Sequence, residues 1–90
     1  MKMIYKYPIT VADRFALSMP QGAQVLTVQS QREVPYIWAL VDPSEPEGVY
    51  EFALVGTGHK REDLDGMPYL GTGQLLGGDL IFHVFGPANS

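Results

Sequence analysis

Apolar and polar residues alternate with a period of two along most of the chain, which is the pattern of half-buried β-strands. The last such segment shows it clearly, because Leu80, Phe82 and Val84 fall together on one face. No stretch of ten or more residues has the 3.6-residue period of an amphipathic helix. The pattern predicts seven short strands, over residues 3–9, 14–19, 23–29, 36–41, 49–55, 69–76 and 80–85.

The second and third predicted strands are separated by Pro20-Gln21-Gly22, a sequence typical of a tight turn. We therefore expect these two strands to pair as a β-hairpin. In the third strand the alternation directs Leu26 and Val28 inward.

The fourth predicted strand, Tyr-Ile-Trp-Ala-Leu-Val over residues 36–41, is apolar on both faces. A strand of this kind is expected in the middle of a sheet, with Trp38 anchoring the core. Gly77-Gly78 is expected to supply the positive φ angles of a later turn.

Short, regularly spaced strands with turn signals between them predict an all-β fold. We expect a single domain over residues 1–90, an antiparallel β-sandwich or small barrel with at most one short helical turn, near residues 61–64. Residues 86–90 are expected to form a flexible tail. A domain of 90 residues has a modest core, so we also expect a homo-oligomer that covers strand edges and apolar faces.

The net charge of −4, from six basic and ten acidic residues, argues against broad binding to nucleic acids. The absence of cysteine removes disulfides, thiolate metal sites and cysteine nucleophiles. The first residues lack the apolar run of a signal peptide, and no segment approaches the roughly 18 apolar residues of a membrane span. We expect a cytoplasmic protein that does not bind membranes.

The segment Gly56-Thr57-Gly58-His59-Lys60-Arg61 carries the most suggestive chemistry. Glycines allow a ligand to approach the backbone, consecutive N–H groups can form an anion-binding concavity, and the three basic side chains can add charge-assisted hydrogen bonds. The segment lacks the spacing of a phosphate-binding P-loop. The alternative is a flexible turn whose basic residues pair with nearby acids, namely Glu62, Asp63 and Asp65.

A second Gly-Thr-Gly occurs at residues 71–73, and it would line one pocket with the first if the two strand ends were neighbours. The alternative is that these glycines mark bulges or corners of a sheet. His83 stands alone in the last strand, where a structural role competes with hydrogen bonding to a ligand on the Ile81/Phe85 face.

No catalytic motif is present: there is no GxSxG nucleophile elbow, no HExxH zinc site and no calcium loop. We therefore expect no enzyme activity, no cofactor and no metal.

Five short motifs follow one another along the chain: Met3-Ile4-Tyr5-Lys6-Tyr7-Pro8, Trp38-Ala39-Leu40-Val41-Asp42-Pro43, Gly56-Thr57-Gly58-His59, Tyr69-Leu70-Gly71-Thr72 followed by Gln74, and Phe82-His83-Val84-Phe85. This ordered set resembles a family of small uncharacterised proteins from tailed phages and prophages. The resemblance implies a phage-encoded accessory protein that acts in the cytoplasm of the infected host cell. It brings no catalytic residue with it.

By analogy with small phage accessory proteins, we expect a non-catalytic binding protein that counteracts host defence by sequestering a small anionic, nucleotide-type signal. The predicted ligand-binding residues are Thr57, Gly58, His59, Lys60, Arg61 and Thr72. Two alternatives remain: an inhibitor that binds the surface of a host protein, and a minor component of the virion.

Overall fold

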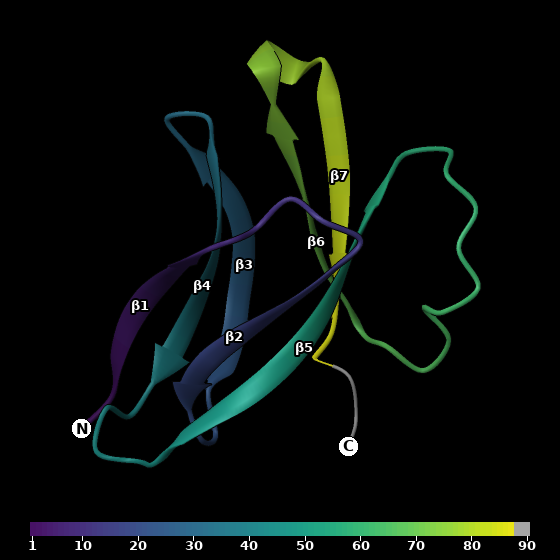
Figure 1. Ribbon diagram of the computed structural model, residues 1–90. Helices are drawn as coiled ribbons and strands as arrows, with labels where there is room; N and C mark the ends of the chain where they lie inside the picture. Colours follow the sequence, from purple (N-terminus) through teal and green to yellow (C-terminus); the bar gives the residue numbers. More distant parts are fainter. Residues whose placement is uncertain (88–90) are drawn as a thin grey trace.

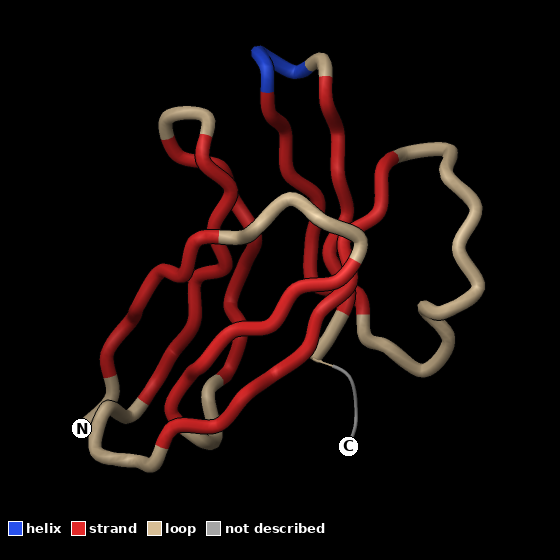
Figure 2. The backbone as a smooth tube through the Cα atoms, in the orientation of Figure 1, coloured by secondary structure: helices blue, strands red, loops and turns tan. Residues whose placement is uncertain are grey.

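Two antiparallel sheets pack face to face, as the computed structural model, which describes residues 1–87, shows in Figures 1 and 2. The elements are β1 (Met3–Pro8), β2 (Arg14–Pro20), β3 (Gln24–Gln31), β4 (Val34–Val41), β5 (Glu47–Gly56), β6 (Tyr69–Leu75), the 3₁₀ turn η1 (Leu76–Gly78) and β7 (Leu80–Phe85). The prediction of an all-β fold with seven short strands is confirmed. The one helical turn lies at η1, whereas residues 61–64 contain no helix.

The smaller sheet, sheet A, has the strand order β1-β4-β3, and the larger one, sheet B, has the order β2-β5-β7-β6. The predicted central position of residues 36–41 is confirmed, because β4 pairs with a neighbour on each side. Every pairing in both sheets is antiparallel.

The predicted hairpin between the second and third strands is wrong, because β2 and β3 belong to different sheets. The turn itself exists, with the Ala23 N–H donating to the Pro20 carbonyl at 3.1 Å, but it crosses from one sheet to the other. β2 pairs with β5 and β3 pairs with β4. The physical reason is that β2 and β3 bury their apolar faces in the same core from opposite sheets, through Phe15 and Met19 on β2 and Val28 on β3.

β3 instead forms a hairpin with β4, through Arg32 and Glu33. Both residues have positive φ, 53° and 65°, as in a type I′ turn. Neither is a glycine, so the conformation needs support from elsewhere. The Glu33 carboxylate supplies it by accepting the N–H groups of Leu76 and Gly77 at 2.5 and 3.1 Å, which fastens the hairpin tip to η1.

Two predicted inward side chains point elsewhere. Leu26 is 46% exposed because a β-bulge between Val25 and Thr27 shifts the register of β3 at this point. Trp38 lies on the outer face of β4 and is only half-buried, since Ile37 and the two alternate residues after it occupy the core face. A strand that is apolar on both faces gives no sign of which face meets the core.

The core is formed by apolar side chains from both sheets. Phe15 and Phe52 stack with their ring centroids 5.2 Å apart. The ring of Phe82 lies against Gly73, where a Cβ atom would come within 2.4 Å of its Cζ. The buried cluster comprises Ile9, Phe15, Met19, Val28, Ile37, Ala39, Val41, Phe52, Leu54, Leu75, Phe82 and Val84.

At the C-terminal end, Gly86 is buried and its N–H donates to the Pro68 carbonyl at 2.8 Å. The chain is therefore held in place through Gly86, and residues 88–90 of the predicted tail lie outside the described residues. Within residues 1–87, no helix has the length and apolar character needed to cross a membrane.

Candidate functional site

The two Gly-Thr-Gly segments meet on the outer face of sheet B, on either side of one histidine. β7 lies between β5 and β6, and the pairing places His83 beside Val55 on one side and Thr72 on the other. Thr57 Oγ1 lies 2.8 Å from His83 Nε2, and Thr72 Oγ1 lies 2.8 Å from His83 Nδ1. Both ring nitrogens are therefore engaged by hydroxyls from segments that are distant in sequence.

The hydrogen-bonded chain extends one step further, because the Tyr69 hydroxyl bonds to Thr72 Oγ1. A neutral imidazole has one N–H donor and one acceptor nitrogen, while a hydroxyl can fill either role. The chain from Thr57 through His83 and Thr72 to Tyr69 therefore accommodates either tautomer by rotation of the hydroxyls alone.

The turn at the end of β5 is shaped by its glycines. Gly58 has φ +84°, and the His59 N–H donates to the Gly56 carbonyl at 3.2 Å. The His59 ring lies so close to Gly56 that a Cβ there would be 3.0 Å from it. The turn thus brings His59 back over the strand end, and Lys60 follows it as an exposed residue.

Arg61 fastens the loop of residues 56–68 to the sheet. Its Nε and Nη2 donate to the two carboxylate oxygens of Asp63 at 2.7 and 2.8 Å, and its Nη1 donates to the Leu54 carbonyl at 2.9 Å. Nη2 also donates to the Asp13 carbonyl at 3.2 Å. The Arg61 side chain is only 14% exposed.

We call the bidentate pair of Arg61 and Asp63 the clasp, and in it one positive side chain is paired with one negative side chain. The hydrogen bonds from Arg61, with a further one from Arg14, hold the pKa of Asp63 well below its usual range, and the bond to Asp63 raises the pKa of Arg61. The guanidinium of Arg61 is therefore already paired with a carboxylate. This agrees, for Arg61, with the alternative in which the basic residues of the segment pair with nearby acids. Lys60 and His59 are the basic residues that this loop presents to solvent.

A cavity of about 320 Å³ lies between the loop and the outer face of sheet B. Its size is at the lower end of the range for sites that bind small molecules. Of the six predicted binding residues, four line it, while Lys60 and Thr72 do not, and Thr72 contacts the cavity wall through His83. The lining residues are Val55, Gly56, Thr57, Gly58, His59, Arg61, Leu64, Tyr69, His83 and Phe85.

The aromatic part of this wall is absent from the set of residues predicted from sequence. Tyr69 and Phe85 lie edge to face with their centroids 5.4 Å apart. The alternation in β7 already places Phe85 on the same face as His83, so that signal was available for Phe85. Tyr69 gave no such signal, since its position depends on the pairing of β6 with β7 and on the bulge between Tyr69 and Gly71.

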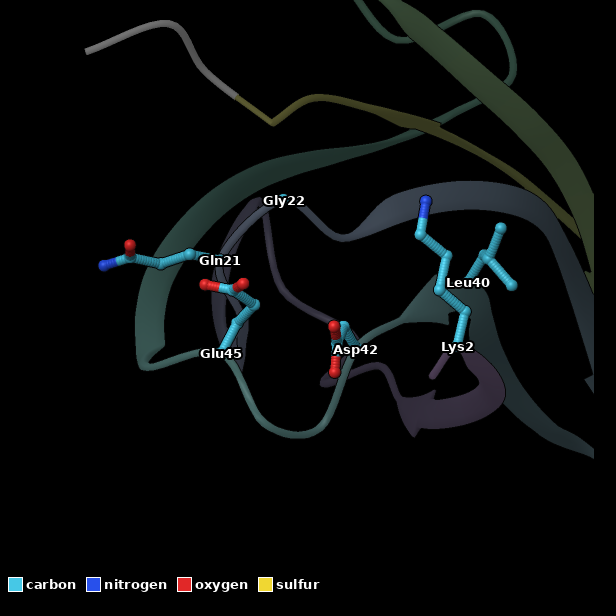
Figure 3. Close-up of a pocket in the computed structure, with 6 residues that line it drawn as sticks. All are labelled: Lys2, Gln21, Gly22, Leu40, Asp42 and Glu45. Atoms are coloured by element: carbon cyan, nitrogen blue, oxygen red, sulfur yellow. The ribbon is translucent and has the colours of Figure 1, made fainter.

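A second cavity, of about 360 Å³, lies at the far end of the sandwich (Figure 3). In that view Asp42 lies between Glu45 and Lys2. Asp42 accepts hydrogen bonds from the Ser44 hydroxyl and N–H at 2.6 and 3.0 Å, which lower its pKa. The Asp42 carboxylate on the wall of this cavity is thus engaged by the turn at Ser44. Across the described part of the chain, no group of three or more His, Asp or Glu side chains is placed to hold a metal ion.

Comparisons with known proteins place the chain in a family. No curated protein and no solved structure matches it. A family model described as a domain of unknown function, DUF7352, matches residues 1–90, which is the whole chain. The chain therefore belongs to the DUF7352 family.

Proposed function

We propose that this protein is a non-catalytic binding protein that holds a small anionic ligand in the cavity beside His83. The observation that carries the proposal is the convergence of Thr57 and Thr72 on the two nitrogens of His83, at the wall of a cavity of ligand size. Such a cavity combines a mostly apolar wall with a few fixed polar groups, which is the usual composition of a small-molecule site.

The lining residues favour a ligand with a flat apolar part and one charged group. Val55, Leu64 and Phe85 offer an apolar wall, and the exposed ring of Tyr69 offers a surface for stacking. The exposed Lys60, next to the lining residue His59, supplies positive charge beside the cavity, and the backbone of Gly58 is exposed. This combination suits a nucleotide-type molecule with a single phosphate better than a highly charged one, because Arg61 is already paired with Asp63.

The environment of His83 supports binding over nucleophilic chemistry. A histidine that activates a hydroxyl nucleophile is commonly oriented by a carboxylate, which stabilises the imidazolium that forms. Here the partner of Nδ1 is the neutral hydroxyl of Thr72. The arrangement fixes the ring and presents the Thr57 hydroxyl, but it gives the imidazolium no nearby negative charge among the residues that bond to it.

The proposed setting is an infected bacterial cell, where a phage-encoded protein in the host cytoplasm sequesters a defence signal. The support for this setting is the resemblance of the five ordered motifs to phage and prophage proteins. A second candidate, an inhibitor that binds a host protein, is favoured by apolar residues on the outer side of sheet A, where Ile4 is 59% exposed and Leu26 is 46% exposed.

The proposal is tested by purifying the protein from phage-challenged cells, heating it, and identifying the released small molecules by mass spectrometry. Sequestration predicts an intact anionic molecule in stoichiometric amount. Recovery of a chemically altered form would point to an enzyme instead. A stable complex with a host protein and no released small molecule would favour the second candidate, and recovery in purified virions would favour a structural role.

Calorimetric titration with AMP and with a cyclic dinucleotide then tests the site. Lys60→Ala is expected to weaken binding about tenfold, in line with the loss of one charge-assisted hydrogen bond. Lys2→Ala is the matched control, since it removes a lysine at the far end of the sandwich. Equal affinities of the wild type and Lys60→Ala would contradict the site assignment. Arg61→Ala is unsuitable for this purpose, because it also releases the loop.

A further inference from the structure

The two sheets have four edge strands, which are β1 and β3 in sheet A and β2 and β6 in sheet B. β3 is covered by β6: the Ser30 hydroxyl donates to the Gln74 carbonyl at 2.6 Å, and Val28 packs against Gly71. In sheet B, the edge strand β2 begins at Arg14, which pairs with Glu51 and Asp63, and ends at Pro20. Charged side chains and proline are common means of blocking an edge.

β1 is the exception. It lies at the margin of sheet A, at the left of the molecule in Figure 1, and within residues 1–87 it pairs only with β4. Three consecutive apolar residues on it are exposed on both faces: Met3 by 45%, Ile4 by 59% and Tyr5 by 39%. An uncovered apolar edge of this kind invites pairing with another strand.

The one charge within β1 does not guard the edge. Lys6 Nζ lies 2.6 Å from Gln31 Oε1 and 4.7 Å from the centroid of the Tyr36 ring. Gln31 is on β3, beyond β4, so the lysine is directed across the sheet and away from its open side. The ammonium therefore leaves the backbone groups of the open edge accessible, while it stays on the outer face of the sheet, where Lys6 lies beside Trp38.

We propose that β1 is the contact surface for a second copy of this chain, whose β1 adds in antiparallel orientation and joins the two three-stranded sheets into one. The occupant is a second copy because the strand is complementary to itself. Met3, Tyr5 and Tyr7 alternate on one face symmetrically about Tyr5. A two-fold axis at Tyr5 therefore places Met3 opposite the partner's Tyr7 and Tyr5 opposite its own copy.

Charge selects this register. A two-fold axis perpendicular to the sheet keeps the outer faces of the two copies on the same side. Outer-face residues of one copy therefore pair with outer-face residues of the other. An axis at Lys6 would set two ammonium groups directly opposite each other, which is unfavourable. The axis at Tyr5 instead sets Lys6 opposite the partner's Ile4 and ends the ladder at Pro8, which has no N–H.

The surface is distinct from the cavity beside His83, which lies on the outer face of sheet B. A dimer formed through β1 would leave that cavity open in both copies. The inference therefore does not depend on the proposed ligand, and either one can fail without the other.

The test is the oligomeric state by sedimentation velocity, with substitutions at the exposed Ile4. Ile4→Lys places an ammonium opposite the partner's Lys6 and is expected to weaken the dimer at least about tenfold. Ile4→Glu removes the same apolar side chain but faces that lysine with a carboxylate, so it is expected to keep the dimer. The double variant Ile4→Lys with Lys6→Glu restores opposite charges and is expected to recover association.

Leu26→Lys is the matched control, because it adds the same charge at another exposed aliphatic residue of sheet A. Thermal melts of each variant monitor folding of the monomer. Three results would overturn the proposal. The first is a wild type that stays monomeric at about 100 µM, which is far above typical dissociation constants of specific dimers. The others are equal effects of lysine and glutamate at position 4, and no recovery of association in the charge-swapped double variant.

Discussion

Thr57 Oγ1 lies 2.8 Å from His83 Nε2, although 26 residues separate the two along the chain. The contact arises because β5 and β7 are neighbours in sheet B, with Val55 beside His83. It joins the turn that follows β5 to the sheet and aligns that turn with the cavity wall. The position of the candidate site therefore depends on this pairing of strands.

The hydroxyl chain is expected to behave as a coupled unit. Thr72→Val keeps the shape of the side chain but leaves His83 Nδ1 and the Tyr69 hydroxyl without their partner, so we expect a loss of about 1 kcal/mol in the free energy of unfolding. Urea denaturation of Thr72→Val, Tyr69→Phe and the double variant measures the coupling. The effect of Tyr69→Phe should shrink once Thr72 is replaced. Strictly additive losses would argue that the hydroxyls act independently.

The clasp between Arg61 and Asp63 is expected to fail in acid. The pKa of Asp63 is lower in the folded chain than in the unfolded one, because of the hydrogen bonds from Arg61. Between the two values the unfolded chain binds a proton that the folded chain does not, so stability decreases as the pH falls below about 4.

The measurement is the free energy of unfolding of wild type and Asp63→Asn from pH 7 to pH 2. We expect Asp63→Asn to be the less stable at pH 7, with a difference that narrows progressively as the pH falls. Glu62→Gln is the control, since Glu62 makes no ion pair within residues 1–87. A difference that is constant over this range would show that the carboxylate of Asp63 is not the group that titrates.

Gly73 is expected to tolerate no side chain. Its added Cβ would meet the Phe82 ring at 2.4 Å inside the core, and we expect Gly73→Ala to lose about 1–3 kcal/mol through overpacking. Phe82→Leu in the same chain should recover part of the loss, because the smaller side chain makes room. Gly48→Ala is the control, where the added atom meets the side chains of Tyr50 at 3.3 Å and Gln21 at 3.4 Å. Equal stability of Gly73→Ala and Gly48→Ala would contradict this packing.

Much of the candidate site followed from local sequence, while its wall did not. The turn at Gly56–His59 and the inward and outward faces of β7 are short-range features, and both were predictable from residue type and alternation. Tyr69 was beyond that reasoning, and so was the anchoring of Arg61 to the sheet, although pairing of the basic residues with nearby acids such as Asp63 was one of the two interpretations of this segment. Tyr69 is brought to His83 by strand order and a bulge, and Arg61 is positioned by backbone carbonyls of Asp13 and Leu54.

The sequence by itself determined that this protein is built from seven short strands, because the period of two and the turn residues between the strands are local properties. Only the tertiary structure decided which strands pair. Strands β2 and β3 are adjacent in sequence, and each has one apolar face. That face can be buried equally well when the two strands pair in one sheet or when they face each other across a core in two sheets. The choice depends on contacts with β4 and β5, and those contacts are long-range.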